Sequence, residues 1–150
     1  MDYEFLIKDL NLNKSQKGIG TDKGLSKIGD AIVNLSYSVA KSNFLTKNNP
    51  NNKPVRTGKK VGRTILGAAL KKANLKHFAK NRANTHDLAD TVEALVAYVW
   101  FSNKITLKGI IDLLTEKLAG NLYNRQEEIS NATIAFTELL NNIKKFLPDK

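Results

Sequence analysis

Three acidic residues recur at intervals of three in a strongly apolar stretch of the chain. Asp87, Asp90 and Glu93 lie within residues 86–100, where most other side chains are apolar. This spacing predicts a helix that carries the acids along one side and packs on the rest of its surface. An ionised carboxylate among apolar side chains is costly unless a cation or hydrogen bonds meet it, so Glu93 in particular needs a partner. A divalent metal ion would supply one.

The ligand types available restrict which metal such a site would hold. The chain of 150 residues has no cysteine and only two histidines, His77 and His86. A disulfide framework, a thiolate zinc site and a cysteine nucleophile are therefore excluded. A site built mainly from oxygen ligands favours magnesium or manganese over zinc. His86, at the start of the expected helix, is better explained as a cap or surface residue than as a ligand.

The formal charge of +10 is concentrated in one block of the chain. Residues 31–86 contain twelve Lys or Arg and no Asp or Glu, whereas residues 1–30 contain five of each. Residues 87–150 carry nine acids and seven bases. A basic block of this kind attracts polyanions, so nucleic acid is the leading class of partner. A solvated face of a lysine-rich protein is the alternative.

Length and composition indicate one soluble domain spanning residues 1–150. Hydrophobic residues make up 41% and charged residues 25% of the chain, as in ordinary globular proteins. No apolar run approaches the roughly 18 residues of a membrane span. The acidic start, Met1 to Glu4, lacks the basic head of a signal peptide. We therefore expect a cytoplasmic protein with no membrane partner.

Hydrophobic periodicity predicts an all-α domain of about six helices, with no internal repeat and no strand of useful length. The expected helices cover about residues 2–12, 23–41, 57–74, 86–100, 107–118 and 126–146. Loops are expected over 11–22 and 43–54, which are rich in Gly, Asn or Pro. Thr21 or Asp22 is the expected cap of the second helix, and Thr85 that of the acidic helix. The inward residues expected on the second helix are Leu25, Ile28, Ile32, Leu35 and Val39.

Two common motifs do not fit the chain. Gly58-Lys59-Lys60 lacks the hydroxyl residue and the upstream glycine of a phosphate-binding Walker loop. His77 and His86-Asp87 invite comparison with histidine–aspartate metal phosphohydrolases. That family places its histidines on separate helices with more chain between them.

A third pattern covers most of the chain. Ile28-Gly29-Asp30-Ala31-Ile32 on one expected helix is followed by Leu88-Ala89-Asp90-Thr91-Val92-Glu93-Ala94-Leu95 on another. This pair resembles the ribonuclease III catalytic domain, which carries a hydrophobic-Gly-Asp-Ala segment and, later in the chain, an Ala-Asp-x-x-Glu-Ala segment. Asp30 and Asp90 stand sixty residues apart, with a basic expected helix between them. The resemblance is strongest over residues 23–118.

The resemblance implies a chemistry for these acids. Asp30 and Glu93 would be the central Mg²⁺ ligands and Asp90 a supporting acid of the same catalytic and metal site, with Mn²⁺ as a possible substitute. Asp87 would be only a first-turn residue favoured by the helix dipole. The implied activity is that of an endoribonuclease that hydrolyses phosphodiester bonds of double-stranded RNA, for example in RNA maturation. Members of the family work as homodimers.

The chain also departs from the family pattern. Family acids four and seven residues before the Gly-Asp aspartate correspond here to Ser26 and Lys23, and a further family acid has no match in residues 31–86. The Mini-ribonuclease III branch is similarly reduced. A non-catalytic double-stranded-RNA-binding dimer with a degenerate site is therefore an alternative. A small-molecule phosphohydrolase acting on nucleotides is a weaker one, because a nucleotide needs few positive charges.

The length leaves no room for a separate double-stranded-RNA-binding domain, so we expect a compact form similar to Mini-ribonuclease III or an archaeal ribonuclease III-like protein. The catalytic domain itself would then hold the RNA, mainly through its phosphates and shape. Tyr98, Trp100 and Phe101 are expected to pack in the core or a dimer interface rather than to stack on bases. The candidate RNA-binding residues are Arg56, Lys59, Lys60, Arg63, Lys80 and Arg82.

Overall fold

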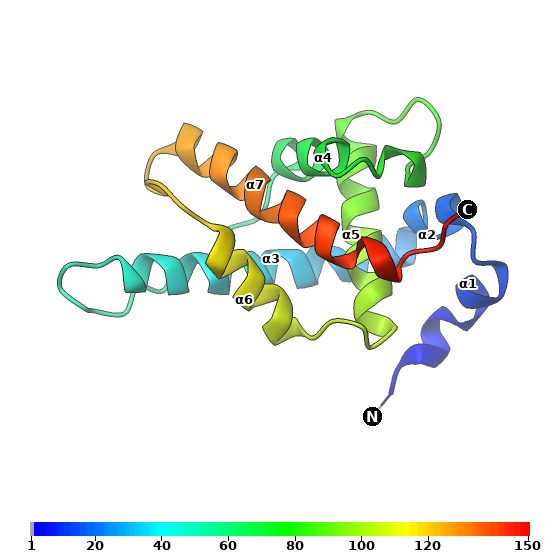
Figure 1. Ribbon diagram of the computed structural model, residues 1–150, viewed down its shortest axis with the longest axis horizontal. Coiled ribbons are helices and arrows are strands. Elements are labelled where there is room, and N and C mark those ends of the chain that lie inside the picture. Colours follow the sequence, from blue (N-terminus) through cyan, green and yellow to red (C-terminus); the bar gives the residue numbers. More distant parts are fainter. Residues whose placement is uncertain (1) are drawn as a thin grey trace.

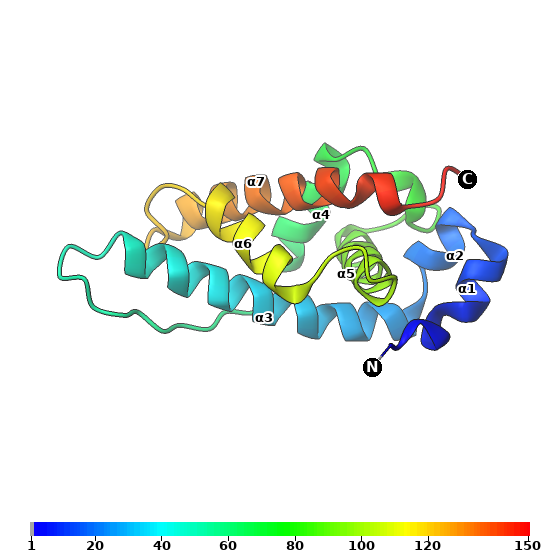
Figure 2. The same cartoon turned by 60° about the horizontal axis from the view of Figure 1, so that its bottom comes forward.

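Helix α5 (Thr85–Phe101) runs through the middle of the protein, because it is apolar on nearly all sides. In the computed structural model, which describes residues 2–150, most side chains of α5 are buried. Figure 2 views α5 nearly end-on, with α3 on one side and α7 on the other. The residues of α5 that escape burial are Thr85, His86, Asp87, Asp90 and Trp100.

Six further α-helices surround α5 in the described part of the chain (Figure 1). They are α1 (Lys8–Asn13), α2 (Gln16–Gly20), α3 (Lys23–Lys47), α4 (Arg63–Lys72), α6 (Leu107–Lys117) and α7 (Arg125–Ile143). Short 3-10 turns cover Glu4–Ile7, Lys76–Phe78 and Lys144–Phe146. Since residues 2–150 contain no strand, the expected all-α class is confirmed. Among the described helices, none is both long and apolar enough to cross a membrane.

The closest approach of α3 and α5 is made by Gly29. A Cβ atom added at Gly29 would lie 1.8 Å from the backbone oxygen of Glu93. Only a glycine hydrogen fits in this space, so the two backbones touch directly. Because Asp30 follows Gly29 in the chain, the contact brings an acid of α3 beside an acid of α5.

Polar caps fix where the central helices begin. Asp22 caps α3, and its Oδ1 accepts from the Leu25 amide at 2.8 Å, as one of the two predicted caps. The predicted cap Thr85 is wrong, because Asn84 performs this role for α5. Asn84 and Asp87 form a capping box, in which each side chain accepts from the other's amide. Asp87 is therefore a first-turn residue, as predicted.

The buried face of α3 differs from the prediction. Ile28 and Leu35 are 39% and 51% exposed. Val33 and Tyr37 are buried in their place, because α3 packs against both α5 and α6 and these contacts lie on another side of the helix. An apolar pair is consequently left on the surface of α3.

The helix predicted from Thr57 begins only at Arg63. Residues 53–62 are instead extended and run back along α3, which itself continues six residues past its predicted end to Lys47. The amides of Val55, Thr57 and Lys59 donate to side-chain oxygens of α3, so they are not available for the hydrogen bonds of a helix. A short helix, α2, also lies within the loop predicted over residues 11–22.

A buried cluster centred on Glu128 links α7 to α3 and to the extended segment. Glu128 is 3% exposed, and its carboxylate accepts from Tyr37 at 2.7 Å. Lys41 and Lys59 pair with the same carboxylate at 2.7 and 2.9 Å. Burial alone would raise the pKa of Glu128, but the hydrogen bonds from these three residues hold that pKa below its usual value. Glu128 is thus ionised and fully paired.

Replacement of Gly29 tests the contact between α3 and α5. We expect Gly29→Ala to destabilise the protein by about 3 kcal/mol or more, because the added methyl group overlaps backbone that cannot move alone. Gly24→Ala, in the exposed first turn of the same helix, is the matched control and should be neutral or slightly stabilising. Urea denaturation of both variants measures the difference. Equal stabilities would contradict the close approach.

Removal of the Glu128 carboxylate tests the buried cluster. Glu128→Ala leaves the largely buried Lys41 without its counterion, which should cost about 3–5 kcal/mol of unfolding free energy. Glu138→Ala, on the same helix and outside any ion pair of the described residues, should change stability by less than about 0.5 kcal/mol. Thermal denaturation followed by circular dichroism would compare the two. A Glu128 variant as stable as the control would show that the cluster contributes little.

Candidate functional site

Asp30 and Glu93 meet at the crossing of α3 and α5, where Gly29 allows the two helices to touch. Both residues line an open cleft of about 550 Å³. Asp90, one turn before Glu93, also lines the cleft. The basic residues of the lining are Lys27, Lys60, Arg63 and His86. The cleft therefore combines the three predicted acids with a rim of positive charge.

The two central carboxyl groups differ in protonation. Burial raises the pKa of Glu93 to about 8, and its hydrogen bond to Asp30 and the negative charges of Asp30 and Asp90 act in the same direction. The hydrogen bond from Glu93 instead lowers the pKa of Asp30 and outweighs its partial burial. Near neutral pH, Glu93 therefore holds a proton that it donates to an ionised Asp30. A cation bound beside this buried carboxyl would replace its proton.

Asp30 also has two partners outside this pair. Its Oδ1 lies 3.3 Å from Lys60 Nζ and accepts from Asn34 Nδ2 at 3.1 Å. The Lys60 side chain is 76% exposed, so this ion pair is weak and exchangeable. An incoming phosphate or metal ion can displace the ammonium group at little cost.

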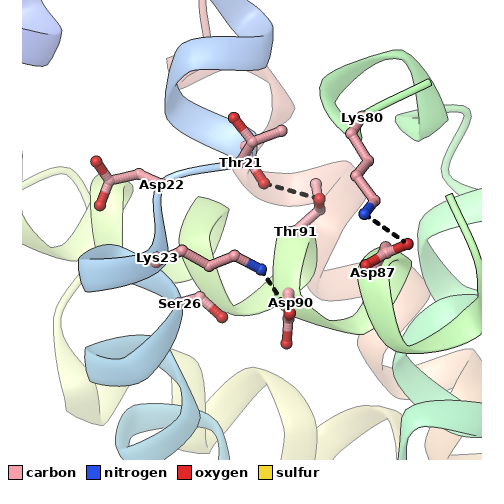
Figure 3. Close-up of a pocket in the computed structure, with 9 residues that line it drawn as sticks. Thr21, Asp22, Lys23, Ser26, Lys80, Asp87, Asp90 and Thr91 are labelled. Carbon is pink, nitrogen blue, oxygen red and sulfur yellow. Dashed lines mark hydrogen bonds and ion pairs between the residues drawn. The ribbon is translucent and has the colours of Figure 1, made fainter.

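Asp90 and Asp87 line a second, smaller cavity of about 90 Å³ (Figure 3), which shares Ser26 and Asp90 with the cleft. Lys23 Nζ lies 3.6 Å from Asp90, and Lys80 Nζ lies 3.4 Å from Asp87. His86 Nδ1 is 3.4 Å from Asp90. Lys23 stands where the resemblance places a family acid, so a cation of the chain itself accompanies Asp90 here.

Two groupings of these acids have oxygen donors suited to a metal ion. Donor atoms of His86, Asp87 and Asp90 lie within 4.8 Å of one another, but Asp87 already accepts from the Asn84 amide in the cap of α5. Asp30 and Glu93 offer hard carboxylate oxygens, and Glu93 retains a proton that a bound cation would replace. This second pair fits Mg²⁺ or Mn²⁺ better.

The six predicted RNA-binding residues do not gather in one place. Lys60 and Arg63 line the cleft, and Arg56 lies exposed further along the extended segment. Lys80 lies at the smaller cavity, and Arg82 is exposed in a left-handed backbone conformation with φ of 57°. Lys59 is turned toward Glu128 and away from the cleft.

Lys27 was missed by sequence reasoning although it lines the cleft. Its position three residues before Asp30 on the same helix was the available signal. Tyr98 and Phe101 are buried, at 7% and 6% exposure, which confirms the expected core packing. Trp100 is partly buried and packs against the same core.

Comparison with known proteins identifies the family of this all-α domain. The family model described as Ribonuclease III matches residues 23–148, which is most of the chain and includes both Asp30 and Glu93. The chain therefore belongs to the ribonuclease III family, a family of nucleases that act on double-stranded RNA. None of the curated proteins matches it.

The raised pKa of Glu93 predicts how stability depends on pH. Folding favours the protonated carboxyl, so its contribution is fully present below the ordinary pKa of 4.5 and is lost as the pH rises through about 8. Over this window the wild-type protein should lose on the order of a few kcal/mol relative to Glu93→Gln. Urea denaturation in EDTA at several pH values measures the loss.

Glu116→Gln, an exposed replacement on α6, is the control for this measurement and should follow the wild-type protein. Parallel pH profiles for wild type and Glu93→Gln would contradict the protonated state of Glu93.

Proposed function

We propose that this protein is a magnesium-dependent endoribonuclease that hydrolyses phosphodiester bonds of double-stranded RNA. The observation that carries the proposal is the pairing of Asp30 with the buried Glu93 in a cleft lined by basic residues. Membership of the ribonuclease III family supports the substrate class. The acid-free block of residues 31–86 supplies Lys60 and Arg63 to the same cleft.

The residues of the cleft have separable roles in this proposal. Asp30 and Glu93 would hold the metal ion, and Asp90 would support them from one turn away. A bound magnesium ion supplies charge neutralisation at the scissile phosphate and activates the attacking water. Glu93 gives up its proton when the ion binds, so metal affinity rises with pH. Lys60 is free to leave Asp30 and, with Arg63, to bind the phosphate backbone.

We also propose that two copies pair through the exposed apolar residues of α3. Ile28 and Leu35 are seven residues apart on one helix face, and the exposed Ala31 lies between them. An exposed apolar row of this kind commonly marks an interface. The row lies on the helix that carries Asp30 but on another of its faces, so a second copy seated there would leave both clefts open in one dimer. Two clefts are what cleavage of both strands of a duplex requires.

The alternative is a duplex-RNA-binding dimer without catalytic activity. The observation that favours it is Lys23, whose ammonium group lies 3.6 Å from Asp90 in the place of a family acid. In that case the positive charge of the chain itself, rather than a metal ion, would neutralise part of the acid cluster. The RNA-binding surface would be retained in both versions of the protein.

Cleavage assays with duplex RNA and Mg²⁺ or Mn²⁺ decide between the two. Glu93→Gln and Asp30→Asn should each lower the rate by at least about 100-fold, because several kcal/mol of charge stabilisation in the transition state are lost. Asp112→Asn, an exposed acid on α6, should cleave like the wild type. Unchanged cleavage by Glu93→Gln would reject the site. Metal-independent duplex binding with no cleavage by the wild type would support the alternative.

A further inference from the structure

A row of polar side chains along α3 holds the backbone of the extended segment. Asn34, Ser38, Ser42 and Thr46 recur every four residues and so share one helix face. Their side-chain oxygens accept from the amides of Val61, Lys59, Thr57 and Val55 at 2.8, 2.8, 3.0 and 2.8 Å. We call these four side chains the α3 ladder. Each step of four residues along α3 thus matches a step of two residues, in the opposite direction, along the segment.

This register has a simple geometric basis. Four residues of an α-helix rise about 6.0 Å, and two residues of an extended chain span about 6.6 Å. The two repeats stay in phase over the four rungs, after which the segment leaves α3 at Val61 and α4 begins. Asp30 lies one step before Asn34 in the same row and is bonded to it. The ladder therefore fixes the segment in register with the candidate metal ligand.

Extended backbone alternates the direction of its polar groups. Since the amides of Val55, Thr57 and Lys59 point to α3, those of Arg56, Gly58 and Lys60 point away from it. All three of these residues are exposed, and no hydrogen-bond acceptor for their amides is found within residues 2–150. The outer edge of the segment thus presents the free amide donors of these three residues, alternating with their carbonyl oxygens, since the carbonyls of Val55, Thr57 and Lys59 accept from α3. Cationic side chains lie on either side of Gly58.

The opposite side of the segment is anchored separately. The Lys59 side chain reaches Glu128 on α7 at 2.9 Å, and Val55 packs against the core. Lys60, which points the other way, reaches Asp30 at 3.3 Å. The outer edge of the segment therefore ends, at Lys60, beside an acid of the cleft, and the inner edge is held by hydrogen bonds to α3 before any ligand binds.

We propose that residues 54–61 form a preorganised rail for the sugar–phosphate backbone of duplex RNA, and that the α3 ladder is what positions it. Arg56, the Gly58 amide and Lys60 would contact successive phosphates of one strand leading into the cleft. The α3 ladder would not contact RNA. It orders an otherwise irregular segment in the free protein, so RNA binding loses no further conformational entropy there. This inference rests on the proposed action on duplex RNA.

The test combines amide hydrogen exchange with RNA affinity in EDTA, where no cleavage occurs. In the Ser38→Ala, Ser42→Ala double variant, exchange at Thr57 and Lys59 should rise at least about 10-fold and duplex RNA should bind about 10-fold more weakly. Alanine favours helix more than serine does, so α3 is retained. Ser36→Ala on the same helix is the matched control: Ser36 is buried and its hydroxyl has no partner among the described residues.

The Arg56→Ala, Lys60→Ala double variant tests the contacts themselves. It should leave hydrogen exchange at Thr57 and Lys59 unchanged and reduce the slope of log affinity against log salt by about 2, because two phosphate contacts are lost. An unchanged slope overturns the rail. Faster exchange in the ladder variant with unchanged affinity overturns the positioning role. If the wild-type protein binds no duplex RNA, the proposed function fails as a whole. If the wild-type protein binds duplex RNA and both double variants bind equally well, only the rail fails.

Discussion

The direct contact between Gly29 and the backbone of Glu93 is the constraint on which the site depends. A helix crossing this close admits no side chain at the point of contact, so the residues on either side of that point are forced together. One of them is Asp30, and the other is Glu93 itself. The acids therefore meet because two backbones touch, and their mutual repulsion is relieved by a proton that Glu93 retains. Packing of the core and chemistry of the cleft are two aspects of the same contact.

A lysine side chain lies beside each of the three acids Asp30, Asp87 and Asp90. Lys60 reaches Asp30, Lys23 reaches Asp90 and Lys80 reaches Asp87, at distances of 3.3 to 3.6 Å. All three lysines are well exposed, so the pairs contribute little to stability. Their consequence is electrostatic: an acid cluster that would repel a polyanion is masked until a stronger cation replaces the ammonium groups.

Part of this structure could be predicted from the sequence, because it depends on local patterns. The periodicity of α5, the cap at Asp22 and the first-turn role of Asp87 all follow from neighbouring residues. The relation of Asp30 to Glu93 came only through resemblance to a family, since no local pattern reveals a contact across sixty residues.

The start of α4 was predicted wrongly for the same reason. The residues after Thr57 have helical spacing, but the amides of Thr57 and Lys59 donate to hydroxyls of α3 rather than to carbonyls of a helix. These hydroxyls belong to Ser42 and Ser38. Lys59 was grouped with the RNA-binding lysines because its buried partner Glu128 lies far along the chain. Through the ion pair of Lys59 with Glu128, α7 also holds the extended segment in place beside the cleft. The shape of the basic surface is therefore set partly from the opposite end of the chain, and a substitution in the last helix can alter the cleft without touching it.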